Sequence, residues 1–328
     1  DIDNWTPFMP NGFSGVMGGV SAVFFAYIGF DAVSTLAEES KNPQRDLPKG
    51  MIYSLVICTA VFIVLALVIT GMVSYELLGV SDPLAEIFAL KGVKWMLFVV
   101  SIAAVVAMTS VLLVFQMGQP RIWMTMSRDG LMPKRFSRIH PKYKTPSYAT
   151  LVTGLVVGLP IFFTDENFVL DFTSIGTLFA FVLVCGGVLM LSPQSEAEIA
   201  ERETKGKFRI PYVNSKFIFP AIVVVAVALI LKYVPDFFIN VFDFSTGEKL
   251  ATNIPMLVFL IVCIVMTFVS FTKNLSLIPL LGLISCCYLL TGMAVSNWMW
   301  FGVWLVIGLV IYFTFSYKNS KLNTEVEH

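Results

Sequence analysis

The sequence predicts an all-α polytopic membrane protein, and three observations carry that prediction. Of its 328 residues, 57% are hydrophobic and 13% are charged, and the mean hydropathy is +0.81, a balance typical of membrane proteins. Apolar runs recur at the length of about 20 residues that crosses a hydrocarbon core of about 30 Å. Lysine and arginine collect in alternate loops. Together these features predict about nine transmembrane helices.

The apolar runs predict where each helix lies. The third run is longer than an upright span needs, so we expect it to tilt or to continue beyond the bilayer. The fourth is short and is interrupted by Gly154, Gly158 and Pro160. The nine predicted spans are residues 13–37, 48–72, 94–126, 147–163, 168–191, 216–234, 254–272, 275–292 and 298–317.

Basic residues divide unevenly between the two sets of loops. Of the 22 lysine and arginine residues, only Lys91, Lys94, Lys232 and Lys249 fall on the side that we assign to the exterior. Because basic loops stay in the cytoplasm, the chain is expected to start outside the plasma membrane and to end inside it. Topology accounts for the positive charge, so the sequence predicts a lipid bilayer and no nucleic acid as its surroundings.

The first span contains a glycine and a carboxylate within the stretch FFAYIGFD, residues Phe24 to Asp31. Gly29 lowers helix propensity, and a charge such as that of Asp31 costs about 2.5 to 3.5 kcal/mol at the centre of a membrane helix. Both residues predict a helix that is broken near residues 26–30 and lines a cavity. The alternative is that Asp31 is an ordinary cap near the cytoplasmic interface.

A broken helix would supply a site for a charged group at its two free ends. The outer half would end in free carbonyls, which can accept hydrogen bonds from a substrate ammonium, and Asp31 would cap the inner half. Aromatic rings nearby would shape or gate the cavity, or would be ordinary packing. The predicted substrate-binding residues are Phe25, Ala26, Tyr27, Ile28 and Gly29, and the predicted caps or gates are Phe30, Asp31, Glu38 and Glu39, with Phe24 among the lining rings.

Several of these residues have plainer interpretations. Glu38 and Glu39 form a cytoplasmic gate or are solvated charges beside basic neighbours. Thr109 and Ser110, midway along the third span, are weak site candidates, because hydroxyls in membrane helices often bond only to carbonyls of their own helix. Asp171, early in the fifth span, points into an outer vestibule or extends towards water.

Enzyme chemistry finds no support in the sequence. The segment from Gly12 to Gly15 has the GxSG form of some intramembrane serine proteases, but the histidines His140 and His328 are placed where neither can act as a base for Ser14. The cysteines all lie in predicted spans and lack metal-binding spacing. The sequence therefore predicts no enzyme, no catalytic residue, no metal site and no cofactor.

The external loop from Ser81 to Trp95 predicts a short amphipathic helix. Asp82 and Pro83 form a typical helix start, and Gly92 marks the expected end. Its place on the outer side makes it a candidate external gate.

Two long motifs resemble one transporter family. They are FFAYIGFDAVSTLAEESKNPQRDLPKG, from Phe24 to Gly50, and GQPRIWMTMSRDGLMP, from Gly118 to Pro133. The segments HPKYKTPS, from His140, and FRIPYV, from Phe208, follow at the matching spacing. The chain resembles, effectively over its whole length, the cationic amino acid transporter family of the amino acid, polyamine and organocation (APC) superfamily.

This resemblance implies a LeuT-like fold of two inverted five-helix repeats, in which the first helix of each repeat is broken at the substrate site. Residues 1–192 would be the second repeat, 193–215 a cytoplasmic connection, 216–317 four peripheral helices and 318–328 a cytoplasmic tail. The family's fourteen spans would leave the first repeat, which receives the substrate carboxylate, outside this sequence. The resemblance also implies that the segment from Ser127 to Gly130 braces an inner loop.

The resemblance further implies that this chain is the C-terminal portion of a secondary amino acid permease, which works by alternating access. Its partners would be an amino acid substrate, a coupling proton and the missing N-terminal repeat. The alternative is a non-transporting membrane subunit or a remnant that lacks the first repeat.

Overall fold

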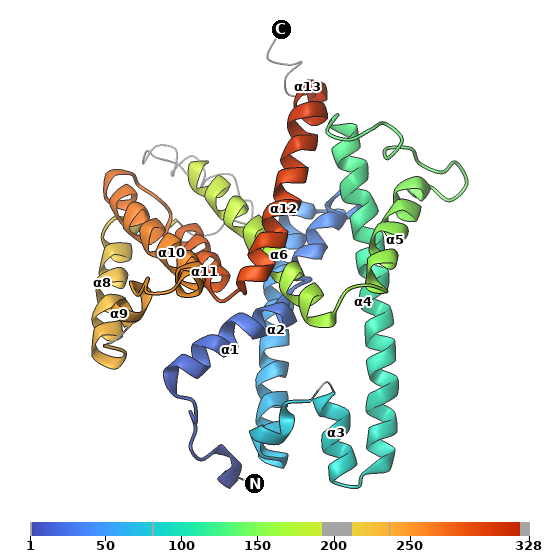
Figure 1. Ribbon diagram of the computed structural model, residues 1–328. Helices are drawn as coiled ribbons and strands as arrows, with labels where there is room; N and C mark the ends of the chain where they lie inside the picture. The colour runs from blue at the N-terminus through green and yellow to red at the C-terminus, as the bar shows by residue number, and fades with distance from the viewer. Residues whose placement is uncertain (1, 81, 192–211, 236, 322–328) are drawn as a thin grey trace. The chain divides into compact units, whose positions relative to one another are not determined.

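The computed structural model describes residues 2–80, 82–191, 212–235 and 237–321 (Figure 1). Within these ranges all regular elements are helices, and the one isolated β-bridge joins Asn214 to Ser276. Most of the predicted cytoplasmic connection and the end of the predicted tail lie outside the described residues. The predicted all-α class is confirmed.

Each of the nine predicted spans coincides with an apolar helix among the described residues. Seven are long and apolar enough to cross a membrane, and two shorter apolar helices, α5 (Ser147–Ile161) and α11 (Leu277–Thr291), coincide with the fourth and eighth predicted spans. The seven candidate spans are Gly15–Thr35, Pro43–Met72, Lys94–Arg128, Phe168–Met190, Ser215–Tyr233, Lys249–Thr272 and Val295–Asn319.

The surfaces of these helices are apolar where a water-soluble protein would be polar. In α2 (Pro43–Met72) no described residue is buried, and Val61 and Val64 are 56% and 61% exposed. In water such a surface would favour aggregation, but lipid tails solvate it without penalty. The chain is therefore a multi-pass membrane protein.

The structure divides into two compact units. The first unit takes residues 1–17, 29–164 and 307–328. In it, α3 (Pro83–Leu90) and α5 both pack against α4 (Lys94–Arg128), as Figure 1 shows. The 3₁₀ helix η2 (Phe30–Glu39) packs against both α2 and α4. This arrangement places η2 where two long helices support it.

Helix α3 lies where the sequence predicted a short helix. Asp82 is its N-cap and accepts a hydrogen bond from the Ala85 amide at 3.2 Å, with Pro83 in the first turn. The helix ends at Leu90, and Gly92 follows with φ +70°. The sequence signals of start and stop are local ones, which is why they predicted the helix well.

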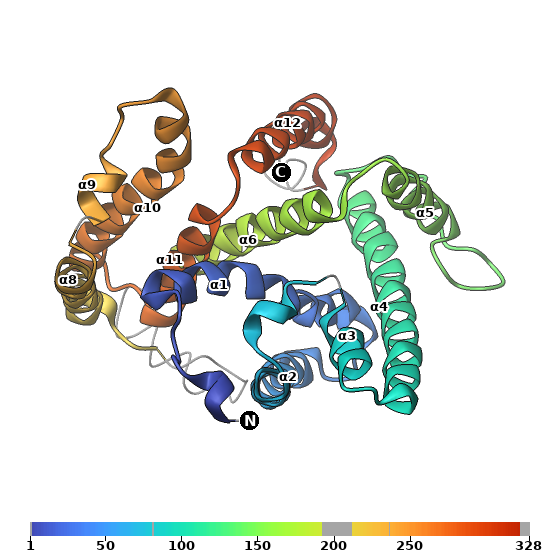
Figure 2. The same ribbon diagram turned by 60° about the horizontal axis from the view of Figure 1, so that its bottom comes forward.

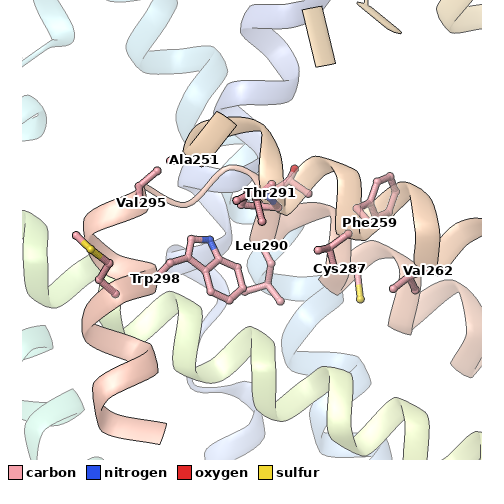
Figure 3. A pocket seen from close by; sticks show the side chains of 12 residues that line it. Ala251, Phe259, Val262, Cys287, Leu290, Thr291, Val295 and Trp298 are labelled. Atoms are coloured by element: carbon pink, nitrogen blue, oxygen red, sulfur yellow. The ribbon is translucent and has the colours of Figure 1, made fainter. Parts of the chain in front are cut away.

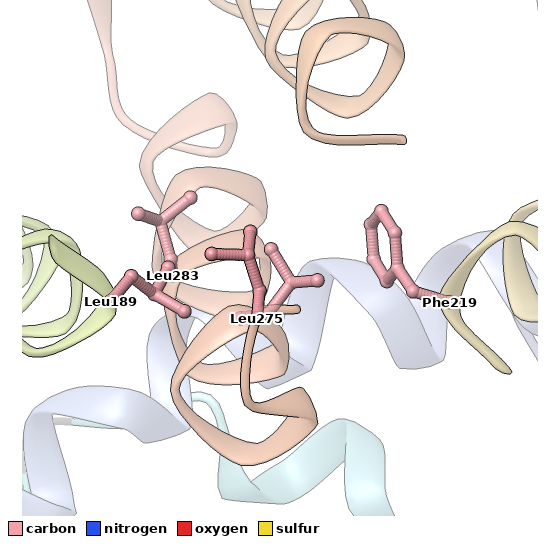
Figure 4. Close-up of a cluster of buried hydrophobic side chains, with 5 residues drawn as sticks. Leu189, Phe219, Leu275 and Leu283 are labelled. Carbon is pink, nitrogen blue, oxygen red and sulfur yellow. The ribbon is translucent and has the colours of Figure 1, made fainter. Parts of the chain in front are cut away.

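The second unit takes residues 18–28 and 165–306. Helix α6 (Glu166–Met190) packs against α11, and α10 (Gly247–Thr272) packs against α8 (Ser215–Tyr233) and α11 (Figure 2). A buried apolar cluster joins these helices (Figure 4). Its members are Leu189, Phe219, Leu275, Leu280 and Leu283.

The remaining elements are either short or divided by a unit boundary. Helices α1 (Gly12–Tyr27) and α12 (Val295–Ile311) each contribute residues to both units. The division into a second repeat and four peripheral helices stays a prediction, because the compact units follow other boundaries. The short elements are η1 (Ile2–Trp5), η3 (Tyr75–Leu78), α9 (Phe237–Val241), the π-helix η4 (Tyr312–Ser316) and α13 (Tyr317–Asn319).

Candidate functional site

The first span is interrupted at Ile28 and Gly29. Helix α1 ends at Tyr27, two turn residues follow, and η2 begins at Phe30. The interruption lies inside the predicted range, with two corrections. Ala26 and Tyr27 stay in the α-helix, and the inner half is a 3₁₀ helix instead of an α-helix. Between the two helices only Ile28 and Gly29 leave the helical conformation.

Gly29 makes the break possible because its backbone has φ +119° and ψ −18°. A residue with a Cβ rarely adopts this region, whereas glycine does so without steric cost. The Gly29 amide donates to Asp31 Oδ1 at 3.2 Å, and the Gly29 carbonyl accepts from the Ala32 amide at 3.1 Å. Asp31 therefore caps the amide at the break itself, where a negative charge also suits the N-terminal end of η2.

The outer side of the break is the C-terminal end of α1. The Ile28 amide donates to the Phe25 carbonyl at 3.1 Å, which tightens the last turn. A carbonyl oxygen has a second lone pair, and the end of the helix carries partial negative charge. This end of α1 can therefore attract a cationic group.

Helix α4 supports the inner side of the break through contacts that the sequence did not reveal. A Cβ at Gly29 would lie 3.8 Å from the ring of Phe115, and a Cβ at Gly118 would lie 3.1 Å from Thr35 Oγ1. Thr35 itself donates to the Ala32 carbonyl at 2.7 Å. Gly118 is the first residue of the motif that ends at Pro133. Only the structure shows that the face of α4 that carries Gly118 packs against η2.

The aromatic candidates lie in different surroundings. Phe24 packs into the second unit's buried cluster around Ile175 and meets Phe181 edge-on, with ring centroids 6.4 Å apart. Phe25 is 38% exposed, and Tyr27 and Phe30 are half-buried. Phe24 therefore takes part in the apolar packing of the second unit.

The two weak candidates on α4 are both exposed. Thr109 Oγ1 donates to the Val105 carbonyl of its own helix at 2.8 Å, a bond that is common for hydroxyls in membrane helices. Thr109 precedes Gly118 by nine residues, so it lies about 180° around the helix from the face that meets η2. The backbones of Glu38 and Glu39 end η2, and their side chains lie outside what the structure describes.

A separate cavity of about 420 Å³ lies within the second unit, between α10, α11 and the start of α12 (Figure 3). Its polar side chains are few: Thr291 donates its hydroxyl to the Tyr288 carbonyl at 2.7 Å, and the buried Trp298 Nε1 has no partner. Without a charged group it does not suit a zwitterion. Its lining residues are Ala251, Ile254, Pro255, Val258, Phe259, Val262, Cys287, Leu290, Thr291, Val295, Trp298 and Met299.

Among the described residues, no group of three histidine, cysteine or acidic side chains is placed to hold a metal ion. All five cysteines are free thiols in or beside membrane helices. The break at Ile28 and Gly29 interrupts the α-helix inside the candidate span Gly15–Thr35. A broken membrane-spanning helix with polar ends is typical of secondary transporters.

Comparison with known proteins narrows this class to one family. The profile of the amino acid permease family matches residues 1–261, and that of the C-terminus of the same family matches residues 275–320. The chain belongs to the amino acid permease family of the APC superfamily. Proteins of this kind move solutes without converting them, so the family is not enzymatic.

Curated relatives carry several different names. The branched-chain amino acid permease BcaP of Bacillus subtilis is 34% identical over 98% of this chain and 54% of its own length. The methylthioribose transporter of the same organism is 32% identical over 98% of the chain and 55% of its own length. The chloroplastic cationic amino acid transporter 9 of Arabidopsis thaliana is 44% identical over 62% of this chain and 36% of its own length. The chain thus spans about half the length of the curated relatives that it matches end to end.

Proposed function

We propose that this chain forms the substrate-binding second repeat and the peripheral helices of a secondary amino acid permease. The permease would work by alternating access in the plasma membrane, with the chain's first residue outside and its last residue in the cytoplasm. The observation that carries the proposal is the break at Gly29. It gives the membrane-embedded chain a helix end that can bind the amine of an amino acid.

The two ends of the break suit different partners. The end of α1 offers carbonyl oxygens and partial negative charge to an ammonium group. On the inner side, Asp31 occupies the Gly29 amide, so that amide is not open to an anion. We therefore expect the segment from Phe25 to Gly29 to bind the substrate amine and a different segment to bind the carboxylate.

The second segment would come from a first repeat. The relatives that match end to end are nearly twice as long as this chain, which supports a further half of similar size. Coupling to a proton is the expected driving force. The names of the relatives favour an apolar or a cationic amino acid as substrate.

The proposed function predicts uptake of amino acids into proteoliposomes by the longer gene product that the proposal requires. Labelled leucine, alanine, lysine and arginine should be tested with an inward proton gradient, and we expect at least one to accumulate about 10-fold over empty liposomes. Residues 1–328 alone should be inert. If the longer product carries none of these amino acids, a non-transporting subunit becomes the better explanation.

The site assignment predicts substrate protection of the break. In a protein whose five native cysteines are replaced, single cysteines at Phe25, Ala26 and Ile28 should react with a water-soluble thiol reagent, and saturating substrate should slow each reaction about 5-fold or more. A cysteine at Val61, which is 56% exposed on α2, serves as the lipid-facing control and should show no protection. Equal reactivity with and without substrate at all three positions would contradict the assignment.

A further inference from the structure

A carboxylate inside the second unit is held by a buried amide. Asp171 lies five residues after the start of α6, about 7.5 Å along the helix axis, within the candidate span Phe168–Met190. Asn297 Nδ2, from the first turn of α12, donates to Asp171 Oδ2 at 2.7 Å. Asn297 is only 4% exposed. Asp171 therefore does not simply extend into water; it joins two membrane helices through a pair of residues that are 126 apart in sequence.

The surroundings of this pair are aromatic. Phe168 stacks on Phe172, with centroids 5.6 Å apart, and meets Trp300 edge-on at 6.2 Å. Phe179 and Phe301 close the same α6 and α12 contact at 5.1 Å. Asp171 itself is half-buried, and an ionised carboxylate within a membrane span is costly unless a partner compensates its charge.

No basic residue occurs on the helices that surround Asp171 in the described part of the second unit. On α6 itself the ionisable residues are Asp165, at the N-cap, Glu166 and Cys185, and α11 carries Cys286, Cys287 and Tyr288. The residues of α12 up to Val306 carry none, and the α1 residues of this unit carry only Tyr27. The amide of Asn297 is therefore the polar partner that the structure shows for Asp171.

An amide serves both protonation states of a carboxyl group. An ionised carboxylate accepts from Nδ2, whereas a protonated one keeps that bond and can also donate its O–H to the amide oxygen. A lysine or arginine partner would instead favour the ionised state alone. This pairing thus suits a group that gains and loses a proton more than it suits a permanent ion pair.

We propose that Asp171 is the residue of this chain that binds and releases the coupling proton, with Asn297 as its positioning residue. The proton comes from water on one side of the membrane, forms an O–H bond with a carboxylate oxygen, and returns to water on the other side. No other bond changes and no redox partner is needed. The inference rests on the proposed permease function and names its coupling site.

Two transport assays separate proton coupling from a structural role. In proteoliposomes of the complete permease, Asp171→Asn should lower accumulation driven by a proton gradient at least 10-fold, because a neutral amide cannot carry the proton. Counterflow, in which labelled and unlabelled substrate exchange without a gradient, should stay within about 3-fold of wild type. Asp165→Asn, which alters an exposed carboxylate at the start of the same helix, is the matched control and should match wild type in both assays.

A second variant tests the role of the amide. Asn297→Leu keeps the carboxyl but removes its donor, so gradient-driven uptake should persist with a pH profile that differs from that of wild type. Accumulation at the wild-type level by Asp171→Asn would overturn the proposal. An equal loss of counterflow and accumulation would also overturn it, because that result would show that Asp171 only holds the two helices together. If transport by the wild-type permease did not depend on the proton gradient, the coupling proposal would be overturned, but the proposed permease function would not.

A spectroscopic measurement keeps the inference testable if no amino acid is transported. Infrared difference spectra between acidic and alkaline pH should show a protonated carboxyl band in the wild-type protein that is absent from Asp171→Asn and present in Asp165→Asn. Such a band would support the proton site even if the proposed transport function fails. Its absence from the wild-type protein would overturn the assignment.

Discussion

Replacing Gly29 with alanine is expected to weaken substrate binding by about 10-fold or more. The backbone at Gly29 has φ +119°, and holding a residue with a Cβ in such a region costs about 1 to 3 kcal/mol. Steric contact is not the cause, because the new Cβ would lie 3.8 Å from the Phe115 ring, an ordinary packing distance. The strain would instead straighten the break and remove the free helix end that binds the amine.

The measurement is the dissociation constant of the transported amino acid for the purified permease, together with its initial rate of uptake. Gly18→Ala is the matched control, since Gly18 lies in α1 with no atom within 4 Å of the added Cβ. That variant should bind as wild type does, and its helix should gain up to about 1 kcal/mol of stability. Unchanged affinity in Gly29→Ala would show that binding does not need the positive φ at this residue.

Replacing Gly130 with alanine is expected to detach the C-terminal segment from the loop after α4. Gly130 has φ +84°, and its added Cβ would overlap the backbone carbonyl oxygen of Asn319. No side-chain movement can relieve an overlap with backbone, and the left-handed backbone adds about 1 to 2 kcal/mol. The segment would lose two hydrogen bonds: Ser316 Oγ to the Leu131 carbonyl at 2.7 Å, and the Lys321 amide to the Asp129 carbonyl at 3.1 Å.

Limited digestion with trypsin measures this detachment, because Lys318 and Lys321 lie within the docked segment. We expect cleavage after these lysines to be at least 10-fold faster in Gly130→Ala than in wild type, since local opening governs such cleavage. Gly158→Ala, at a helical glycine with open space around it, is the control and should be cleaved at the wild-type rate. Equal cleavage of all three proteins would mean that Gly130 does not hold the segment in place.

The contacts of Gly130 bear on the role predicted for the SRDG motif, residues Ser127 to Gly130. The segment was expected to brace an inner loop, and the structure shows Ser127 Oγ donating to the Pro133 carbonyl at 2.8 Å within that loop. What the sequence did not indicate is the partner. Ser316 and Leu131 are 185 residues apart, and no local pattern links them.

Features that depend on a few neighbouring residues were predictable. Apolar length located each membrane helix, the Asp-Pro pair located α3, and Gly29 with Asp31 located the break within the first span. Each of these follows from chain-local physics: hydrophobic thickness, capping and backbone freedom. The 3₁₀ form of η2, which packs against α2 and α4, was not predicted.

The sequence by itself therefore determined the class of protein, the nine apolar helices and the place where the first of them is interrupted. Tertiary structure alone decided which helix faces meet: Gly118 against Thr35 on η2, and Asn297 against Asp171 on α6. The physical reason is that these helices are apolar around most of their circumference. In lipid, burial does not select one face, so helix rotation is set by close contacts of small residues and by polar pairs between distant parts of the chain.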